Sequence, residues 1–150
     1  MAKNKSEIKI HSYGIYKNWD SQTKELPQII EFTTTVNASL DVEFGFIINV
    51  KKAKGLRLEY CIYHPNIPDE EGGVLPPFSG HVYIKSNNWD FYLGDTIWLP
   101  IETKLGAWRM SVEINQKVVA EKTFHVVQRE QQSEIEFWQK RGYSQKINAK

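Results

Sequence analysis

GAWRMSVEINQKVVAEKTFHVV, residues 106–127, is the stretch from which the fold is best predicted. Its first part alternates apolar and polar side chains, with Trp108 on one face and Arg109 on the other, which is typical of a half-buried strand. The polar residues 115–117 interrupt this pattern, and a second β-rich run follows them. The two runs predict an antiparallel hairpin. An isolated hairpin is marginal in water, so its apolar face needs a second sheet to cover it.

Further stretches have the alternation or the β-branched content of strands: 8–16, 29–35, 36–50, 56–63, 81–85 and 91–99. The alternation over 36–50 is too long for one typical strand, so we expect a bend near 37–41. No apolar helical pattern separates the strands, and parallel strands would need helical crossovers. The sequence therefore predicts an all-β, immunoglobulin-like antiparallel β-sandwich of about seven to eight strands.

A length of 150 residues fits one domain, which we expect to occupy residues 1–127. The chain changes character beyond that point. Residues 129–141 lack Gly and Pro and place Ser133 three positions before Glu136, so they predict an appended C-terminal α-helix within 128–150. We expect the tail after Tyr143 to be disordered.

The charge balance gives no global attraction to nucleic acid or to anionic lipid, since 19 basic and 18 acidic side chains leave a net charge of +1. The basic turn over 51–57 is more typical of a solvated tip than of a phosphate site. No stretch approaches the ~18 apolar residues of a membrane span, and the first residues are polar. We therefore expect a cytoplasmic protein, with nucleic acid an improbable partner and no membrane partner.

No pattern of known chemistry is present: the sequence has no glycine-rich phosphate loop, HExxH, paired-cysteine metal motif or Gly-x-Ser-x-Gly elbow. The single cysteine, Cys61, cannot form an internal disulfide and lies in an apolar run, where we expect a buried thiol. His64 and His81 flank a long loop that carries the acidic residues 69–71, yet no ligand-like spacing joins them. We expect no catalytic residues, no metal and no cofactor, and hence no enzyme.

Aromatic residues give the remaining functional lead, because 7 Phe, 5 Trp and 7 Tyr are compatible with a sandwich core, a sugar-stacking platform or an interface. The candidate binding residues near the long loop are Tyr63, His64, Phe78, Trp89 and Tyr92. Those of the expected helix are Ile135, Phe137 and Trp138.

Two functions fit these residues. The first is a non-enzymatic protein-protein interaction module that binds another protein or a copy of itself. The second is a carbohydrate- or small-ligand-binding β-sandwich that uses loop aromatics. A flat row of exposed rings would favour the second function, whereas a continuous apolar patch near a strand edge would favour the first.

Several short motifs, taken in order, resemble those of a bacterial family of small domains of unknown function. They are Tyr13-Gly14-Ile15-Tyr16, Phe44-Gly45-Phe46, His64-Pro65, Trp98-Leu99-Pro100, Gly106-Ala107-Trp108 and the run from Ala120 to Val127. The resemblance spans about Glu7 to Val127. It implies an immunoglobulin-like β-sandwich and supplies no catalytic residue.

Overall fold

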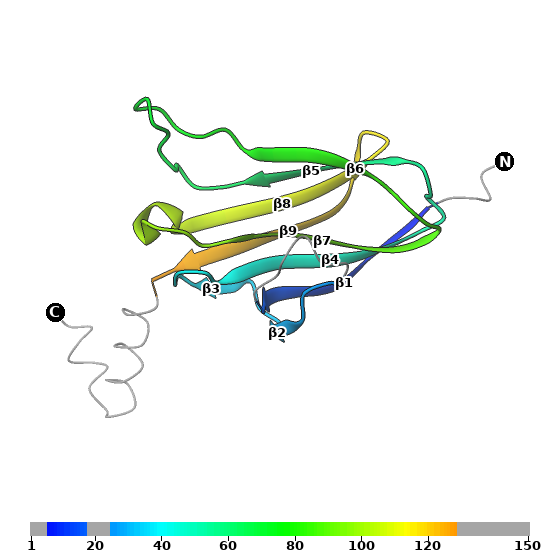
Figure 1. Cartoon of the computed structure of the whole chain (residues 1–150), viewed down its shortest axis with the longest axis horizontal. Helices are drawn as coiled ribbons and strands as arrows, with labels where there is room; N and C mark the ends of the chain where they lie inside the picture. The colour runs from blue at the N-terminus through cyan, green and yellow to red at the C-terminus, as the bar shows by residue number, and fades with distance from the viewer. Residues whose placement is uncertain (1–5, 18–24, 129–150) are drawn as a thin grey trace, which may run out of the picture.

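A computed structural model describes residues 6–17 and 25–128, and over these residues nine strands form two packed sheets (Figure 1). The four-stranded sheet has the order β2-β1-β4-β7. Its strands are β1 (Glu7–Tyr16), β2 (Ile29–Glu31), β4 (Glu43–Lys51) and β7 (Asn88–Thr96). The five-stranded sheet has the order β3-β9-β8-β5-β6. Its strands are β3 (Thr35–Asn37), β5 (Arg57–Tyr63), β6 (Phe78–Tyr83), β8 (Gly106–Ile114) and β9 (Lys117–Val127).

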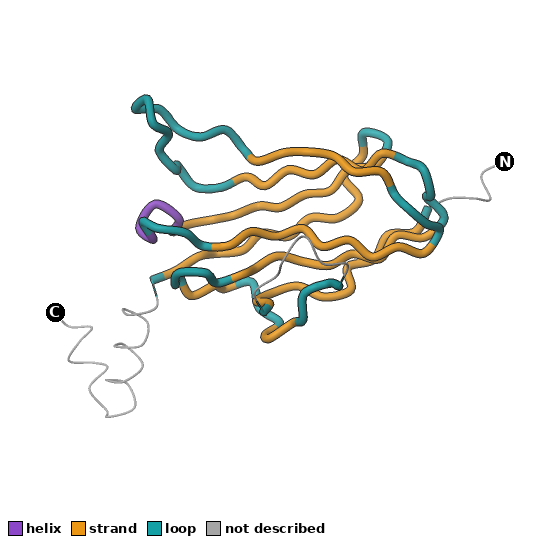
Figure 2. The backbone as a smooth tube through the Cα atoms, viewed as in Figure 1, coloured by secondary structure: helices purple, strands orange, loops and turns teal. Residues whose placement is uncertain are grey.

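The hairpin predicted from residues 106–127 is confirmed as the antiparallel pair β8–β9, in which Trp108 lies opposite Phe124. The bend expected near 37–41 is also confirmed, since the chain leaves β3 in one sheet and enters β4 in the other. Loops gather at the two ends of the strands, and the long loop over 64–77 lies at the same end as a short 3-10 turn, Ile101–Lys104 (Figure 2).

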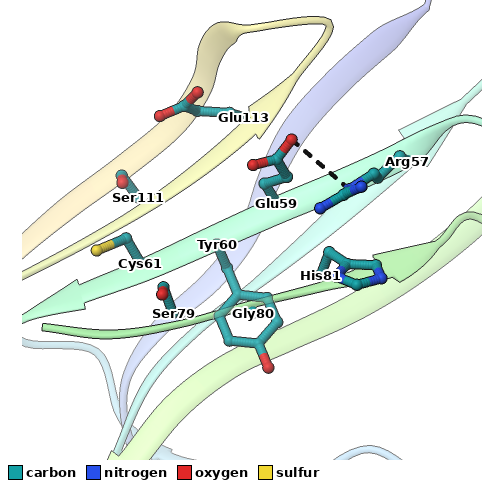
Figure 3. A pocket seen from close by; sticks show the side chains of 9 residues that line it. All are labelled: Arg57, Glu59, Tyr60, Cys61, Ser79, Gly80, His81, Ser111 and Glu113. Atoms are coloured by element: carbon teal, nitrogen blue, oxygen red, sulfur yellow. Dashed lines mark ion pairs between the residues drawn. The ribbon is translucent and has the colours of Figure 1, made fainter.

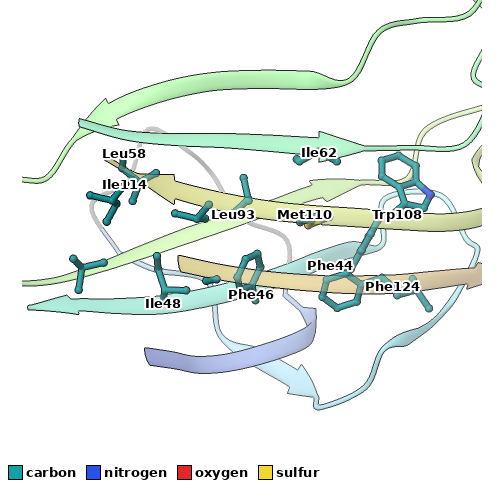
Figure 4. Packing of buried hydrophobic residues seen from close by; sticks show 14 of the residues in the cluster. Phe44, Phe46, Ile48, Leu58, Ile62, Leu93, Trp108, Met110, Ile114 and Phe124 are labelled. Carbon is teal, nitrogen blue, oxygen red and sulfur yellow. The ribbon is translucent and has the colours of Figure 1, made fainter. Parts of the chain in front are cut away.

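The core lies between the sheets and is built from the alternating faces that the sequence predicts (Figure 4). Phe44 of β4 meets the Trp108 ring edge-on, with 5.3 Å between ring centroids, and Phe124 at 5.6 Å. Trp108 has no exposed surface, so its predicted place in the core is confirmed. Gly14 has a φ of 134°, and a Cβ there would lie 2.8 Å from the Thr33 nitrogen, which explains the glycine in this strand.

The all-β sandwich is confirmed, but three parts of the fold prediction were wrong. The appended C-terminal α-helix is not supported: the described part of the chain contains no α-helix, and the stretch 129–141 lies outside it. A capping pair and helix propensity were the only local signals for that helix, and both are weak predictors without tertiary packing. The strands number nine because 29–35 divides between two sheets.

The third correction concerns strand direction, because β3 pairs with β9 in parallel. No crossover helix is needed for this pair, since the chain between the two strands runs through most of the sandwich before returning. Among the described residues, the structure also has no helix that is long and apolar enough to cross a membrane.

Candidate functional site

The side of the sandwich where β6 and β7 end their sheets carries two free strand edges. Among the residues that the structure describes, β6 is the last strand of one sheet and pairs only with β5, whereas β7 is the last strand of the other and pairs only with β4. The chain passes from one to the other through residues 84–87, so both edges border the same opening between the sheets.

Half-buried aromatic rings fill this opening and pack against the core; we call them the aromatic seam. Its members are Tyr60, Phe78, Trp89, Phe91 and Trp98. Trp89 stacks on Phe91 with centroids 5.4 Å apart, and Phe91 lies 6.1 Å from Tyr60. Nearer the long loop, Phe78 lies 6.2 Å from Trp98. The seam therefore consists of two groups of partly buried rings beside two strand edges, where a bound partner would cover their remaining exposed surface.

Gly80 makes the middle of the seam possible. Tyr60 lies opposite Gly80 in the β5–β6 register, and its ring passes beside that glycine (Figure 3). A Cβ at position 80 would lie 2.7 Å from Cζ of Tyr60 and would also clash with the phenol oxygen. The missing side chain lets the Tyr60 ring extend over β6 towards Phe91.

The loop end of the seam is held by His64. Its Nδ1 lies 2.6 Å from the Pro65 carbonyl oxygen and its Nε2 lies 2.9 Å from that of Pro76, so the ring joins the two ends of the long loop. The same ring lies 4.5 Å from Phe78. This loop is itself ordered by Asp69, whose Oδ1 accepts hydrogen bonds from the amides of Glu71 and Gly73, both at 2.8 Å.

Cations border the aromatic rings at this end. Nζ of the buried Lys104 lies 4.2 Å from the centre of the Trp98 ring, and loss of hydration lowers the pKa of this lysine. The Arg109 guanidinium lies 3.8 Å from the centre of the Tyr63 ring and donates to Glu121 at 2.6 Å. Tyr63 is thus held by a cation on the outer face of the five-stranded sheet, where it is 37% exposed.

One carboxyl group near the seam has a strongly shifted pKa. Burial raises the pKa of Asp95 to about 6, and the negative charge of Glu43 adds to the effect, while the Thr96 amide and His64 oppose it. Glu43 itself is buried and accepts hydrogen bonds from the hydroxyl groups of Tyr92, at 2.5 Å, and Thr96, at 2.7 Å. These contacts satisfy a buried carboxylate, and we assign them a structural role.

The sequence-predicted binding residues divide among several places. Phe78 and Trp89 belong to the seam and His64 lies at its loop end, whereas Tyr63 lies beside Arg109 on the outer face of the five-stranded sheet. Tyr92 does not join them: it lies on the outer face of its sheet against Tyr16 and Ile47 and is 5% exposed, so it is not an exposed anchor. The remaining candidates, Ile135, Phe137 and Trp138, lie outside the described residues.

Sequence reasoning missed Tyr60, Phe91 and Trp98. The alternation in β7 places Trp89 and Phe91 on one face of the sheet and Tyr92 on the other. Strand parity could therefore have assigned Phe91 to the seam together with Trp89 and excluded Tyr92. Tyr60 gave no such signal, because its role depends on Gly80 of another strand.

The outer face of the five-stranded sheet carries a shallow polar hollow of about 340 Å³. Cys61 lies there between Ser79 and Ser111 of the neighbouring strands, half-buried rather than fully buried as expected (Figure 3). In the part of the chain that the structure describes, no three His, Cys, Asp or Glu side chains are grouped to hold a metal ion.

Comparison with known proteins bears on the family and the fold. A family model described as a domain of unknown function, DUF3859, matches residues 4–126. An immunoglobulin-like protein from Pseudomonas aeruginosa is similar in structure, with 24% identity, a TM-score of 0.64 and coverage of 81% of this chain and 97% of that one. This likeness shows the fold alone.

An alkylpurine DNA glycosylase from Pseudomonas fluorescens, solved with DNA containing an abasic-site analogue, also matches. It has 12% identity and a TM-score of 0.40, with 80% of this chain and 30% of that one covered. A likeness this weak carries no argument about this chain. No curated protein matches the sequence.

Proposed function

The chain belongs to the DUF3859 family of domains of unknown function, and since that family description assigns no activity, we propose from the geometry that it is a non-enzymatic protein-binding module. It binds its partner along the free edge of β6, through main-chain pairing that extends the five-stranded sheet. The observation that carries the proposal is an uncharged, unprotected edge strand beside the half-buried aromatic seam.

The hydrogen-bonding groups of β6 that remain available can be assigned by residue. The Ile84 amide donates to Leu56 at 2.9 Å, and the Ile84 carbonyl accepts from Gly55 at 2.8 Å, so both backbone groups of Ile84 point towards the β5 side. Backbone groups alternate in direction along an antiparallel strand. Those of Ser79, His81 and Tyr83 therefore point away from β5, towards the free edge.

Strand β6 lacks the features that usually block edge pairing. Its sequence, FSGHVY, has no Lys, no Pro and no acidic residue, whereas β7, the other edge strand on this side of the sandwich, carries Asp90 and Asp95. Natural sheets use charges, prolines and bulges to prevent such pairing. A free edge without them supports binding at β6 rather than at β7.

The carbohydrate alternative gains no support from the rings. Trp89 and Phe91 stack face to face at an interplanar angle of 24° and are half-buried, so they do not form a flat exposed platform. The proposal places the protein in the cytoplasm. Proteins of oxidising compartments are often stabilised by disulfides, and a chain with a single cysteine cannot form one internally.

Proline at position 81 tests the proposal. His81→Pro removes an amide that points to the free edge and leaves the β5–β6 ladder intact, because prolines are tolerated where the N–H side of an edge strand faces solvent. We expect wild-type protein, used as bait in a lysate of its own organism, to retain partners that the variant loses. Hydrogen exchange should show that the bound partner protects the amides of Ser79, His81 and Tyr83.

Two further variants make the result interpretable. Tyr83→Lys adds a charge to the same edge without touching the backbone. Val118→Lys places the same charge at an exposed position of β9, which pairs with β8 on the far side of the five-stranded sheet from β6. Partner retention should fall for the first and persist for the second. Equal retention by His81→Pro, Tyr83→Lys and wild type, with all three folded by circular dichroism, would refute the proposal.

A further inference from the structure

We infer that the partner taken up at the β6 edge is a second copy of this chain, paired antiparallel to the first around a two-fold axis at His81. This inference rests on the proposed function and names its partner. The resulting dimer has one ten-stranded sheet, formed from the two five-stranded sheets joined through β6.

The register of the pair follows from the available backbone groups. A two-fold axis through His81 places Ser79 of each copy opposite Tyr83 of the other, and His81 opposite itself. All of these residues direct their backbone groups outward, so each pair exchanges both of its N–H···O bonds. All the outward-facing backbone N–H and C=O groups of β6 are then hydrogen-bonded to the second copy.

Neighbouring registers are poorer. An axis through Gly80 would bring Pro77 opposite Tyr83, and proline has no amide to donate. An axis through Val82 would bring Ser79 opposite Lys85, which lies beyond the end of β6. The length of β6 and the prolines before it therefore select the axis at His81.

The absence of charged side chains in β6 also allows two copies of this strand to pair. Strand β6 has no Lys, Arg, Asp or Glu, so no like charges of the two β6 strands meet at the junction. The nearest charged side chains on the adjoining strand, Arg57 and Glu59, form an ion pair of 3.6 Å within β5. Two copies of a strand with a strong net charge would repel each other, whereas two copies of β6 carry no such charge.

The aromatic seam supplies apolar area to the same contact. Because β6 and β7 border one opening, a copy paired along β6 also faces the half-buried rings of Phe78, Trp89 and Phe91. A second copy presents its own seam at the same place, so both strips are covered at once. Main-chain pairing thus sets the register while the rings contribute burial.

Cysteine trapping tests the inference in the full chain with Cys61→Ser as background. Opposed residues in a hydrogen-bonded antiparallel pair have Cα atoms ~5.5 Å apart, within disulfide range. His81→Cys should therefore form a covalent dimer under mild oxidation. Glu113→Cys lies in the same row on β8, and since five strand spacings separate the two copies of this residue by about 24 Å, it should not cross-link.

The register has its own test. Ser79→Cys and Tyr83→Cys should cross-link when mixed, because they oppose each other across the axis. Neither should cross-link alone, since each lies four residues, roughly 14 Å along the strand, from its own copy. Cross-linking by Ser79→Cys alone would overturn the axis at His81.

Analytical ultracentrifugation measures the reversible monomer–dimer equilibrium. We expect a wild-type dimer whose dissociation constant rises at least about tenfold in both variants. His81→Pro removes hydrogen bonds in both copies, and Tyr83→Lys places a lysine on the pairing edge of both copies. A monomer at all accessible concentrations, or a dimer that these variants leave unchanged, would overturn the inference. If the protein is monomeric but His81→Pro still loses partners from the lysate, the protein-binding function stands and only the second-copy inference falls.

Discussion

Trp108 shows how one side chain fixes the sandwich interior. It is fully buried, contacts Phe44 edge-on, and donates from Nε1 to the Lys104 carbonyl at 2.8 Å. Trp108→Ala should cost ~3 to 5 kcal/mol, because the cavity cannot close and a buried carbonyl loses its donor. Chemical denaturation measures this cost. A midpoint equal to that of the wild type would contradict the core position.

The buried carboxyl group of Asp95 predicts that the stability of the protein depends on pH. Its pKa rises from 3.8 to about 6 on folding, mainly because it is buried. The folded state holds this proton more tightly, so the stability that it contributes is present below pH 3.8 and is lost as the pH rises through about 6.

Asp95→Asn tests this dependence, since the amide oxygen can still accept from the Thr96 amide, which donates to Oδ1 at 2.8 Å. The variant should be more stable than the wild type at pH 7, by at most roughly 3 kcal/mol. The difference should shrink towards pH 4. Urea denaturation across this range measures it, and parallel stability curves for the two proteins would show that Asp95 has an ordinary pKa.

At the scale of elements, β5 and β6 are fitted to each other through Tyr60 and Gly80. Gly80→Ala should destabilise the domain by about 1 to 2 kcal/mol, because the new Cβ displaces the Tyr60 ring. In a Tyr60→Ala background the same substitution should cost nothing. A double-mutant cycle by denaturation measures this coupling. Ser79→Ala, one residue away on the outer face, is the matched control, and additive effects would contradict the contact.

At the scale of the whole molecule, the described sandwich carries its own core. All nine strands end by Val127, and the family match ends at residue 126. Removal of residues 129–150 should therefore change the free energy of unfolding by less than about 0.5 kcal/mol, as for other changes outside a core. It should also leave dimer formation sensitive to His81→Pro.

Thermal melting and sedimentation of the truncated protein test this expectation. Loss of the β signal would place residues 129–150 in the core. Loss of association alone, reproduced by Trp138→Ala in the full chain, would move the interface away from β6. His81→Pro in the full chain is the matched comparison.

The sequence alone determined the strands and their faces. Alternation has a period of two, so Trp108, Phe44 and the β8–β9 hairpin could be placed before any tertiary information. The charge balance and the lack of metal and phosphate motifs are also properties of the chain itself. Local signals were weaker beyond Val127, where a capping pair predicted an α-helix that the structure does not support.

Only the tertiary structure decided which strands lie at the edges and which rings meet. Sheet order depends on contacts between residues far apart in the chain, and no local period encodes it. Tyr60 reaches Phe91 because Gly80 of another strand leaves room, and Tyr92 is buried against Tyr16 although its neighbour Phe91 belongs to the seam. Strand β5 pairs with β8 on one side and with β6 on the other, and no described strand pairs beyond β6, so β6 becomes an edge. The β5–β8 pairing joins residues about fifty positions apart.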